Sequence, residues 1–173
     1  MIDTRDVIEF FDRLASTWDA GMVRNEPVIA RILDLAGVVH VTAVDISPKM
    51  AQIAQGKFAG DDRVTILCAD AQTMAFDRRF DCILIYNAFP HFSEPERLFD
   101  NLSRQLKLGG RLTVAHGMSR ERINDHHRGG ASHVSYGLMP ARDLAALMAP
   151  FVAVDQVLSD DSMYLVSGIN RQP

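Results

Sequence analysis

Short apolar runs along the chain have the length and β-branched content of strands. They cover residues 41–44, 64–69, 80–86 and 111–116. The run at 80–86 is apolar almost throughout, which predicts a strand that is buried on both faces. Two further stretches with alternating polarity flank a pair of aspartates near the end of the chain and predict an antiparallel hairpin, at 151–158 and 162–169.

Other segments space their apolar residues three or four positions apart, which is the pattern of amphipathic helices. These predicted helices are 5–19, 26–36, 47–60, 94–107, 119–127 and 140–148. Because strands alternate with helices, we expect an α/β fold with a doubly wound, mostly parallel sheet that ends in the antiparallel hairpin.

The composition is that of one soluble globular domain of 173 residues, with 47% hydrophobic and 23% charged residues. We expect a single domain over 1–173, with helices in 1–37 and the sheet core in 38–173. The net charge is −4 and charges of both signs are mixed along the chain, so the sequence offers no basic face for a nucleic acid.

The sequence also bears on location. No apolar run reaches the roughly 18–20 residues that a membrane span requires, and the acidic, helix-like N-terminus does not resemble a signal peptide. Cys68 and Cys82 both lie inside apolar runs, which favours buried thiols over a disulfide or a metal pair. We therefore expect a protein of the reducing cytoplasm, with no membrane partner.

Two acidic residues follow predicted strands directly. Asp45 comes after the strand at 41–44, and Asp70 ends the strand at 64–69. An acid at the carboxyl end of such a strand accepts hydrogen bonds from two ribose hydroxyls in nucleotide-binding folds. A helix-capping role for Asp45 and a turn role for Asp70 are the structural alternatives.

Five segments, in chain order, resemble class I S-adenosylmethionine-dependent methyltransferases of the small, quinone-biosynthesis-like type. They are F-D-R-L-A-S-T-W-D (11–19), V-T-A-V-D-I-S-P-K-M (41–50), A-D-A-Q-T-M-A-F (69–76), F-D-C-I-L-I-Y-N-A-F-P-H-F (80–92) and L-K-L-G-G-R-L-T-V-A-H (106–116). In the last segment Leu108 replaces the proline that is usual in the family.

The resemblance implies S-adenosylmethionine as the cofactor and gives roles to residues on the cofactor side. Asp45 would bind the ribose, Ile46 and Met50 would line the adenosine, and Asp70 with Ala71 would contact the adenine.

Further along the chain, Asn87, Ala88 and Phe89 would lie under the cofactor, and His91 would stand at the mouth of the pocket, unless it is a surface histidine. Phe11 and Trp18 would belong to a lid formed by the helices of 1–37, with core packing as the alternative.

Histidines crowd the stretch after the strand at 111–116, namely His116, His126, His127 and His133. We predict catalytic roles for His91 and His116, with His126 and His133 near the substrate or lid. A general base, a transition-metal site and plain polar loop residues all stay open. No standard metal-ligand spacing is present, so we assign no metal.

The resemblance has a gap. The family places a strand, a Gly-rich loop and a helix before the strand at 41–44, but this chain contains no G-x-G-x-G. The missing piece is roughly 25–30 residues, one βα unit. Three accounts are open: the sequence omits an internal segment, the strands at 41–44 and 80–86 pair directly, or a second copy fills the gap by domain swapping.

The resemblance therefore implies methyl transfer from S-adenosylmethionine to a small-molecule acceptor, by an enzyme that is a possible homodimer. One alternative is a non-catalytic methyltransferase-like binding domain that has lost the cofactor loop. A weaker alternative is a nucleotide-binding oxidoreductase, which the closing hairpin and the L-K-L-G-G turn disfavour.

Overall fold

The computed structural model describes residues 2–20 and 39–172, and these form two compact units. The smaller unit is 8–70, and the larger unit combines 1–7 with 71–173. Each unit is described by itself, and the single-domain organisation stays a prediction. The predicted helix 26–36 lies outside the described residues. No helix within the described ranges is both long enough and apolar enough to cross a membrane.

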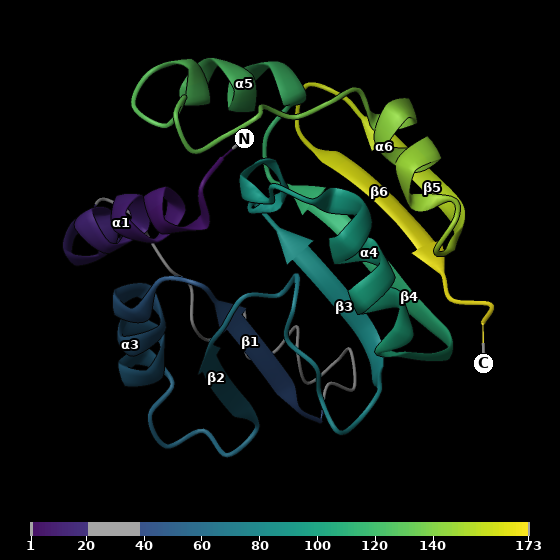
Figure 1. Ribbon diagram of the computed structural model, residues 1–173, viewed down its shortest axis with the longest axis horizontal. Helices are drawn as coiled ribbons and strands as arrows, with labels where there is room; N and C mark the ends of the chain where they lie inside the picture. Colours follow the sequence, from purple (N-terminus) through teal and green to yellow (C-terminus); the bar gives the residue numbers. More distant parts are fainter. Residues whose placement is uncertain (1, 21–38, 173) are drawn as a thin grey trace. The chain divides into compact units, whose positions relative to one another are not determined.

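The described part of the smaller unit is built on two parallel strands and the helix between them (Figure 1). Strand β1 (Val41–Asp45) pairs with β2 (Val64–Cys68), and the connection between them contains α3 (Pro48–Lys57). Ser47 caps α3, since its Oγ accepts a hydrogen bond from the Met50 N–H at 3.1 Å. Helix α1 (Thr4–Leu14) starts in the larger unit and continues into the smaller one, where a 3₁₀ turn, η1 (Ala15–Thr17), follows it.

The larger unit contains a four-stranded sheet in the order β3-β4-β6-β5. Its strands are β3 (Phe80–Tyr86), β4 (Leu106–His116), β5 (Ala153–Ser159) and β6 (Tyr164–Ile169). β3 and β4 are parallel, whereas β4–β6 and β5–β6 are antiparallel. The predicted α/β fold and its closing antiparallel hairpin are therefore confirmed.

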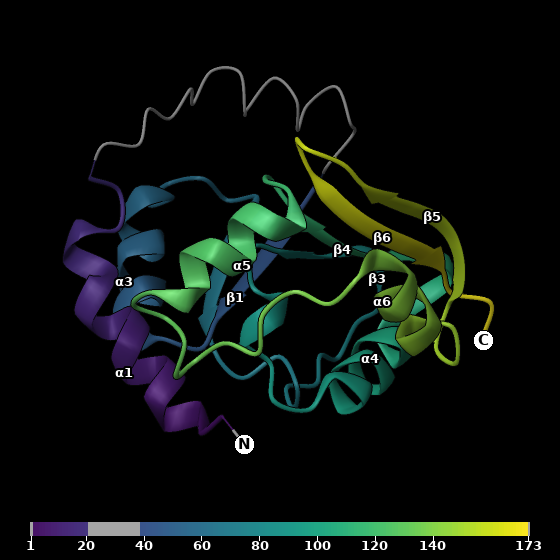
Figure 2. The ribbon, with the colours of Figure 1, turned by 90° about the horizontal axis from the view of Figure 1, so that it is seen from above.

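Three helices and a 3₁₀ turn complete the larger unit. They are η2 (Phe89–His91), α4 (Pro95–Arg104), α5 (Arg120–Arg128) and α6 (Ala141–Met148). Figure 2 shows α4 and α6 side by side, and α6 packs on β5 and β6 while α4 packs on β4. Their apolar faces meet the sheet in one core that includes Leu98, Phe99, Leu112, Leu144, Met148 and Val166. Ser119 caps α5, since its Oγ accepts a hydrogen bond from the Arg122 N–H at 3.3 Å.

Two predictions about burial are wrong. In β3, Leu84 and Tyr86 are each 57% exposed, although the apolar run predicted a strand covered on both faces. β3 pairs only with β4 among the described residues, so it is an edge strand of its sheet. Cys68 and Cys82 are free thiols, as predicted, but both are exposed rather than buried.

Direct pairing of the strands at 41–44 and 80–86 is also not found. Within the described ranges, β1 is hydrogen-bonded to β2 and β3 to β4, in two separate sheets. Among the described residues, β1 and β3 are therefore each hydrogen-bonded to one strand.

The two glycines of the L-K-L-G-G segment serve backbone geometry. Gly109 has φ of +79°, a conformation that favours glycine. A Cβ on Gly110 would lie 2.9 Å from the Lys107 carbonyl oxygen and 3.1 Å from that of Phe80. Gly110 therefore allows β3 and β4 to approach at the point where their register shifts.

We predict that Gly110→Ala destabilises the protein by about 2 kcal/mol, because the added methyl group must displace backbone atoms. Urea unfolding followed by circular dichroism would measure the change. Gly130→Ala is the control, since a Cβ there meets nothing within 4 Å, and its effect should stay within about 0.5 kcal/mol. Equal stability of the two variants would contradict the close approach.

The core of the larger unit contains a polar pair at the end of β4. His116 is 2% exposed and opposes Tyr164, which is fully buried, in the β4–β6 register. Their rings meet edge to face with centroids 5.9 Å apart, and neither His116 Nε2 nor Tyr164 Oη has a hydrogen-bond partner among the described residues. Burial, helped by the neighbouring His127 and His91 rings, lowers the pKa of His116 to about 4.

This pair predicts a pH-dependent stability. The unfolded His116 has an ordinary pKa of 6.5 and the folded residue one of about 4, so the unfolded state binds more protons between these values. The free energy of unfolding should be fully retained above pH 6.5 and fall toward pH 4, by at most about 1.4 kcal/mol per pH unit from this residue.

The measurement is urea unfolding across pH 4–7 for the wild type and His116→Gln, which should flatten the slope. His126→Gln, at an exposed position of the same unit, is the matched control and should keep the wild-type slope. The prediction fails if the two variants have the same slope.

Candidate functional site

The smaller unit brings its two predicted acids to one edge of the β1–β2 pair. Asp45, the last residue of β1, is in register with Cys68, the last residue of β2. The Ala69 N–H donates to the Asp45 carbonyl oxygen at 3.0 Å, and Asp70 follows directly. Because β1 and β2 are parallel, both acids lie at the carboxyl edge, where α/β folds bind ligands.

The Asp45 carboxylate is half-buried and only partly used by the protein. Its Oδ1 accepts a hydrogen bond from the Ser47 N–H at 2.8 Å, while Oδ2 has no donor among the described residues. Burial raises the pKa of Asp45; the Ser47 hydrogen bond counteracts this, and the nearby Asp12 carboxylate adds to the rise. The second oxygen is therefore an acceptor that a ligand hydroxyl group can use.

The start of α3 is also tied to α1. The Ser47 hydroxyl donates to Asp12 Oδ1 at 2.5 Å, and the Lys49 N–H donates to the same oxygen at 3.1 Å. Asp19 and Lys57 form an ion pair further along. These contacts hold the C-terminal half of α1 against the helix that follows Asp45.

The residues of this unit that are predicted to form the lid or to line the adenosine lie in or next to α1 and α3. Phe11 contacts Trp18 edge to face, with ring centroids 5.7 Å apart, and Trp18 is 39% exposed. Ile46 and Met50 are half-buried next to the Ser47 cap. Their roles toward a ligand stay predictions.

In the larger unit, Asn87 fixes the end of β3. It has φ of +52°, its N–H donates to the Ala115 carbonyl oxygen at 3.0 Å, and its Oδ1 accepts from the Gly117 N–H at 3.1 Å. Asn87 tolerates this left-handed conformation better than most residues. The side chain thus ties the turn after β3 to the turn after β4.

The remaining residues predicted to lie near the cofactor pack on the core of the larger unit. Phe89 is 4% exposed and stacks on Phe99, with ring centroids 5.6 Å apart. Ala71 and Ala88 are half-buried against the same core. Their cofactor roles stay predictions.

His91 lies in η2, where two hydrogen bonds join the segment after β3 to the segment before α6. His91 Nδ1 is 2.7 Å from the Val134 carbonyl oxygen, and the Tyr136 N–H donates to the Pro90 carbonyl oxygen at 3.0 Å. Burial lowers the pKa of His91, and the hydrogen bond to Val134 offsets part of the change.

His127, in the last turn of α5, is the residue that the sequence prediction did not single out. Its ring centroid is 5.1 Å from that of His91, and its Nδ1 is 2.7 Å from Ser135 Oγ. Burial, then the His91 and His126 rings, lower the pKa of His127 to about 4. A signal was present in the sequence, because His127 follows the buried Ile123 by four residues and so shares its helix face.

The predicted histidine cluster therefore separates into two sets. His91, His116 and His127 are buried or half-buried, and the nearby His127 and His91 both lower the pKa of His116. His126, with its ring centroid 6.1 Å from that of His127, and His133 are exposed. Within residues 2–20 and 39–172, no group of three or more His, Cys, Asp or Glu side chains is placed to hold a metal ion.

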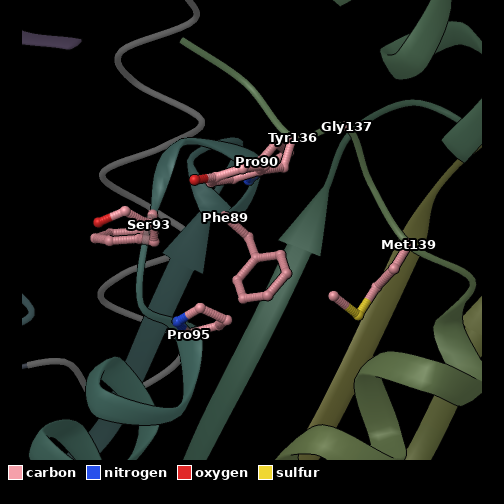
Figure 3. A pocket seen from close by; sticks show the side chains of 8 residues that line it. Phe89, Pro90, Ser93, Pro95, Tyr136, Gly137 and Met139 are labelled. Atoms are coloured by element: carbon pink, nitrogen blue, oxygen red, sulfur yellow. The ribbon is translucent and has the colours of Figure 1, made fainter. Parts of the chain in front are cut away.

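A cavity of about 240 Å³ opens beside the joined segments (Figure 3). The Phe89 ring lies between Pro95 and Met139, and Tyr136 lies against Pro90 at one end. The Tyr136 hydroxyl accepts a hydrogen bond from the Ile2 N–H at 2.7 Å. The lining is mostly apolar and aromatic and carries no formal charge: Phe89, Pro90, Phe92, Ser93, Pro95, Tyr136, Gly137 and Met139.

Curated relatives are similar over part of the chain. A demethylmenaquinone methyltransferase of Clavibacter sepedonicus is 36% identical over 115 residues, 59% of this chain and 45% of the relative. A malonyl-[acyl-carrier protein] O-methyltransferase of Priestia megaterium is 33% identical over 72 residues, 42% of this chain and 26% of the relative. The chain thus spans less than half the length of these two relatives.

Among solved structures, a magnesium protoporphyrin IX methyltransferase from Synechocystis PCC 6803 with bound SAH has a TM-score of 0.67. The alignment covers 97% of this chain and 99% of that one at 13% identity, which shows the shared fold. A family model described as a methyltransferase domain matches residues 27–114, half of the chain and the stretch that contains Asp45, Asp70 and His91. The chain belongs to this methyltransferase domain family.

Proposed function

We propose that this protein transfers a methyl group from S-adenosylmethionine to a small-molecule acceptor. The observation that carries the proposal is the pair of acids, Asp45 and Asp70, at the carboxyl edge of two hydrogen-bonded parallel strands inside the family match. Membership of the family and similarity to curated methyltransferases favour an enzyme over a non-catalytic binding domain.

The residues present fit this cofactor. Asp45 offers Oδ2 to a ribose hydroxyl group, while Ile46 and Met50 supply apolar surface for the adenosine. Asp70 and Ala71 would hold the adenine, and Asn87, Ala88 and Phe89 the remainder. Phe11 and Trp18 would cover the cofactor. When bound, S-adenosylmethionine supplies a methyl group on a sulfonium that a nucleophile attacks in line.

The contribution of the chain is to bind, orient and take up a proton. His91 is the proposed general base, because its lowered pKa keeps the imidazole neutral at physiological pH. His116 is buried at the end of β4, and its catalytic role stays a prediction. His126 and His133 are surface residues, for which we propose a role at the edge of the acceptor site.

The cavity beside Phe89 has the size for a small molecule, and the sequence has no basic stretch. Both observations support a small molecule rather than a nucleic acid as the methyl acceptor. A cytoplasmic location and a homodimer stay predictions from the sequence. The Gly-rich segment that the family places before β1 is absent from the chain. The affinity for the cofactor therefore decides between an active enzyme and a non-catalytic binding domain.

We predict that S-adenosylhomocysteine binds the protein and that Asp45→Asn weakens this binding at least tenfold. The amide keeps an oxygen for the Ser47 N–H but replaces the ligand-binding oxygen with a donor, which costs one charge-assisted hydrogen bond. Calorimetric titration of the intact chain measures both affinities.

Asp61→Asn is the matched control, because Asp61 makes the same kind of turn, with the Arg63 N–H at 3.0 Å, before the amino end of β2. It should leave the affinity unchanged. No binding to the wild type would favour the non-catalytic alternative, and equal affinity of Asp45→Asn and wild type would remove Asp45 from the site.

A further inference from the structure

We propose that Asn101 and Gln105, on α4, are positioning residues for the adenine end of the cofactor, and that they make the protein select adenine over hypoxanthine. The inference rests on the proposed function and deepens it, because it names residues that hold the base-binding backbone without touching the ligand. Its basis is a set of hydrogen bonds from amide side chains to segment 71–76, which follows β2 and Asp70 in the chain.

Asn101 uses both hydrogens of its side-chain amide on this segment. Its Nδ2 donates to the Ala71 carbonyl oxygen at 2.9 Å and to the Met74 carbonyl oxygen at 2.8 Å. The apolar side of the same helix is buried and includes Leu98 and Leu102. One amide therefore holds two carbonyl groups that are three residues apart, and this fixes the backbone between them.

Gln105 follows Asn101 by four residues, at the end of α4, and so lies on the same side of the helix. Its Oε1 accepts a hydrogen bond from the Phe76 N–H at 3.1 Å. Its Nε2 donates to the Met74 carbonyl oxygen at 2.9 Å and to the Asn101 carbonyl oxygen at 3.2 Å. The Met74 carbonyl oxygen thus accepts one hydrogen bond from each of the two amides, which uses both of its lone pairs.

A third amide joins the segment to the start of α4. Gln72 Oε1 accepts a hydrogen bond from the Glu94 N–H at 2.9 Å, and Glu94 is the residue before the first turn of α4. Gln72 is 6% exposed and Gln105 7%, and buried amides are costly unless they are hydrogen-bonded. Both ends of α4 are therefore tied to segment 71–76, which contains no helix or strand of its own.

Ala71 is the residue that this arrangement positions for the base. Its carbonyl oxygen is held by Asn101, whereas its N–H has no hydrogen-bond partner among the described residues. A backbone N–H can donate to N1 of adenine, but N1 of hypoxanthine carries a hydrogen and cannot accept. Because a fixed peptide cannot turn away from the mismatched base, the rigidity of segment 71–76 creates a preference for adenine.

The test measures how tightly the intact chain binds S-adenosylhomocysteine and S-inosylhomocysteine, which carries hypoxanthine in place of adenine, by calorimetric titration. We expect the wild type to prefer S-adenosylhomocysteine by about tenfold, the value of one hydrogen bond. In Asn101→Ala, the affinity for S-adenosylhomocysteine should fall about tenfold, while that for S-inosylhomocysteine should stay within about threefold. Gln105→Glu keeps the acceptor for Phe76 but has no donor for Met74, so it should lose part of the preference.

Two control variants separate positioning of the base from weaker folding or weaker binding in general. Asn124 also holds a backbone by its amide, since it is hydrogen-bonded to the Leu138 N–H at 2.6 Å and to the Leu138 carbonyl oxygen at 3.1 Å. Asn124→Ala should lower the melting temperature as Asn101→Ala does and leave the preference unchanged. Asp45→Asn should weaken the binding of both probes alike, because the two probes have the same ribose.

An Asn101→Ala variant that keeps the wild-type preference, or that loses affinity for both probes alike, would overturn the inference and leave the proposed function standing. Failure of the proposed function has a different signature, since the wild type would then bind neither probe and the inference would fall with it. Melting temperatures show whether each variant folds. If Asn101→Ala does not fold, Gln105→Glu decides by the same ratio of affinities, and an unchanged ratio overturns the inference.

Discussion

The position of the segment that carries Phe89 and His91 depends on how β3 ends. The Asn87 N–H and side-chain oxygen are hydrogen-bonded to the segment that ends β4, and the backbone at Asn87 takes a left-handed conformation. This turn directs the chain into η2, where Phe89 is anchored on Phe99 and His91 meets Val134. The turn therefore positions Phe89, which lines the cavity, and His91, whose ring lies next to that of His127.

The neutral state of the histidines follows from the same packing. η2, α5 and the segment before α6 meet around His91 and His127, so both rings lose water, and burial is the main cause of their lowered pKa values. A protonated pair would repel itself and could not accept a proton. The packing that removes water from these rings is thus what keeps both imidazoles neutral near neutral pH.

In the smaller unit, the single residue Ser47 orients the acid Asp45. Ser47 caps α3, donates to Asp12 and supplies the N–H that orients Asp45, so one buried side chain with its backbone positions the acid. Among the described contacts of Asp45, its Oδ1 accepts the Ser47 N–H and its Oδ2 accepts none. Ser47 and not Asp45 caps α3, and the hydrogen bond from the Ser47 N–H to Asp45 is compatible with the proposed ligand role, since each uses a different oxygen.

The sequence by itself determined the family, the order of strands and helices, the closing hairpin and the two acids at strand ends, because hydrophobic period and local motifs are written in neighbouring residues. It did not determine that β3 is an edge strand with exposed Leu84 and Tyr86, because burial depends on which strands pair. Nor did it select His127 over His126 as the neighbour of His91. That choice was decided by the tertiary structure, since the packed face of α5 carries Ile123 and turns one of two adjacent histidines inward and the other to solvent.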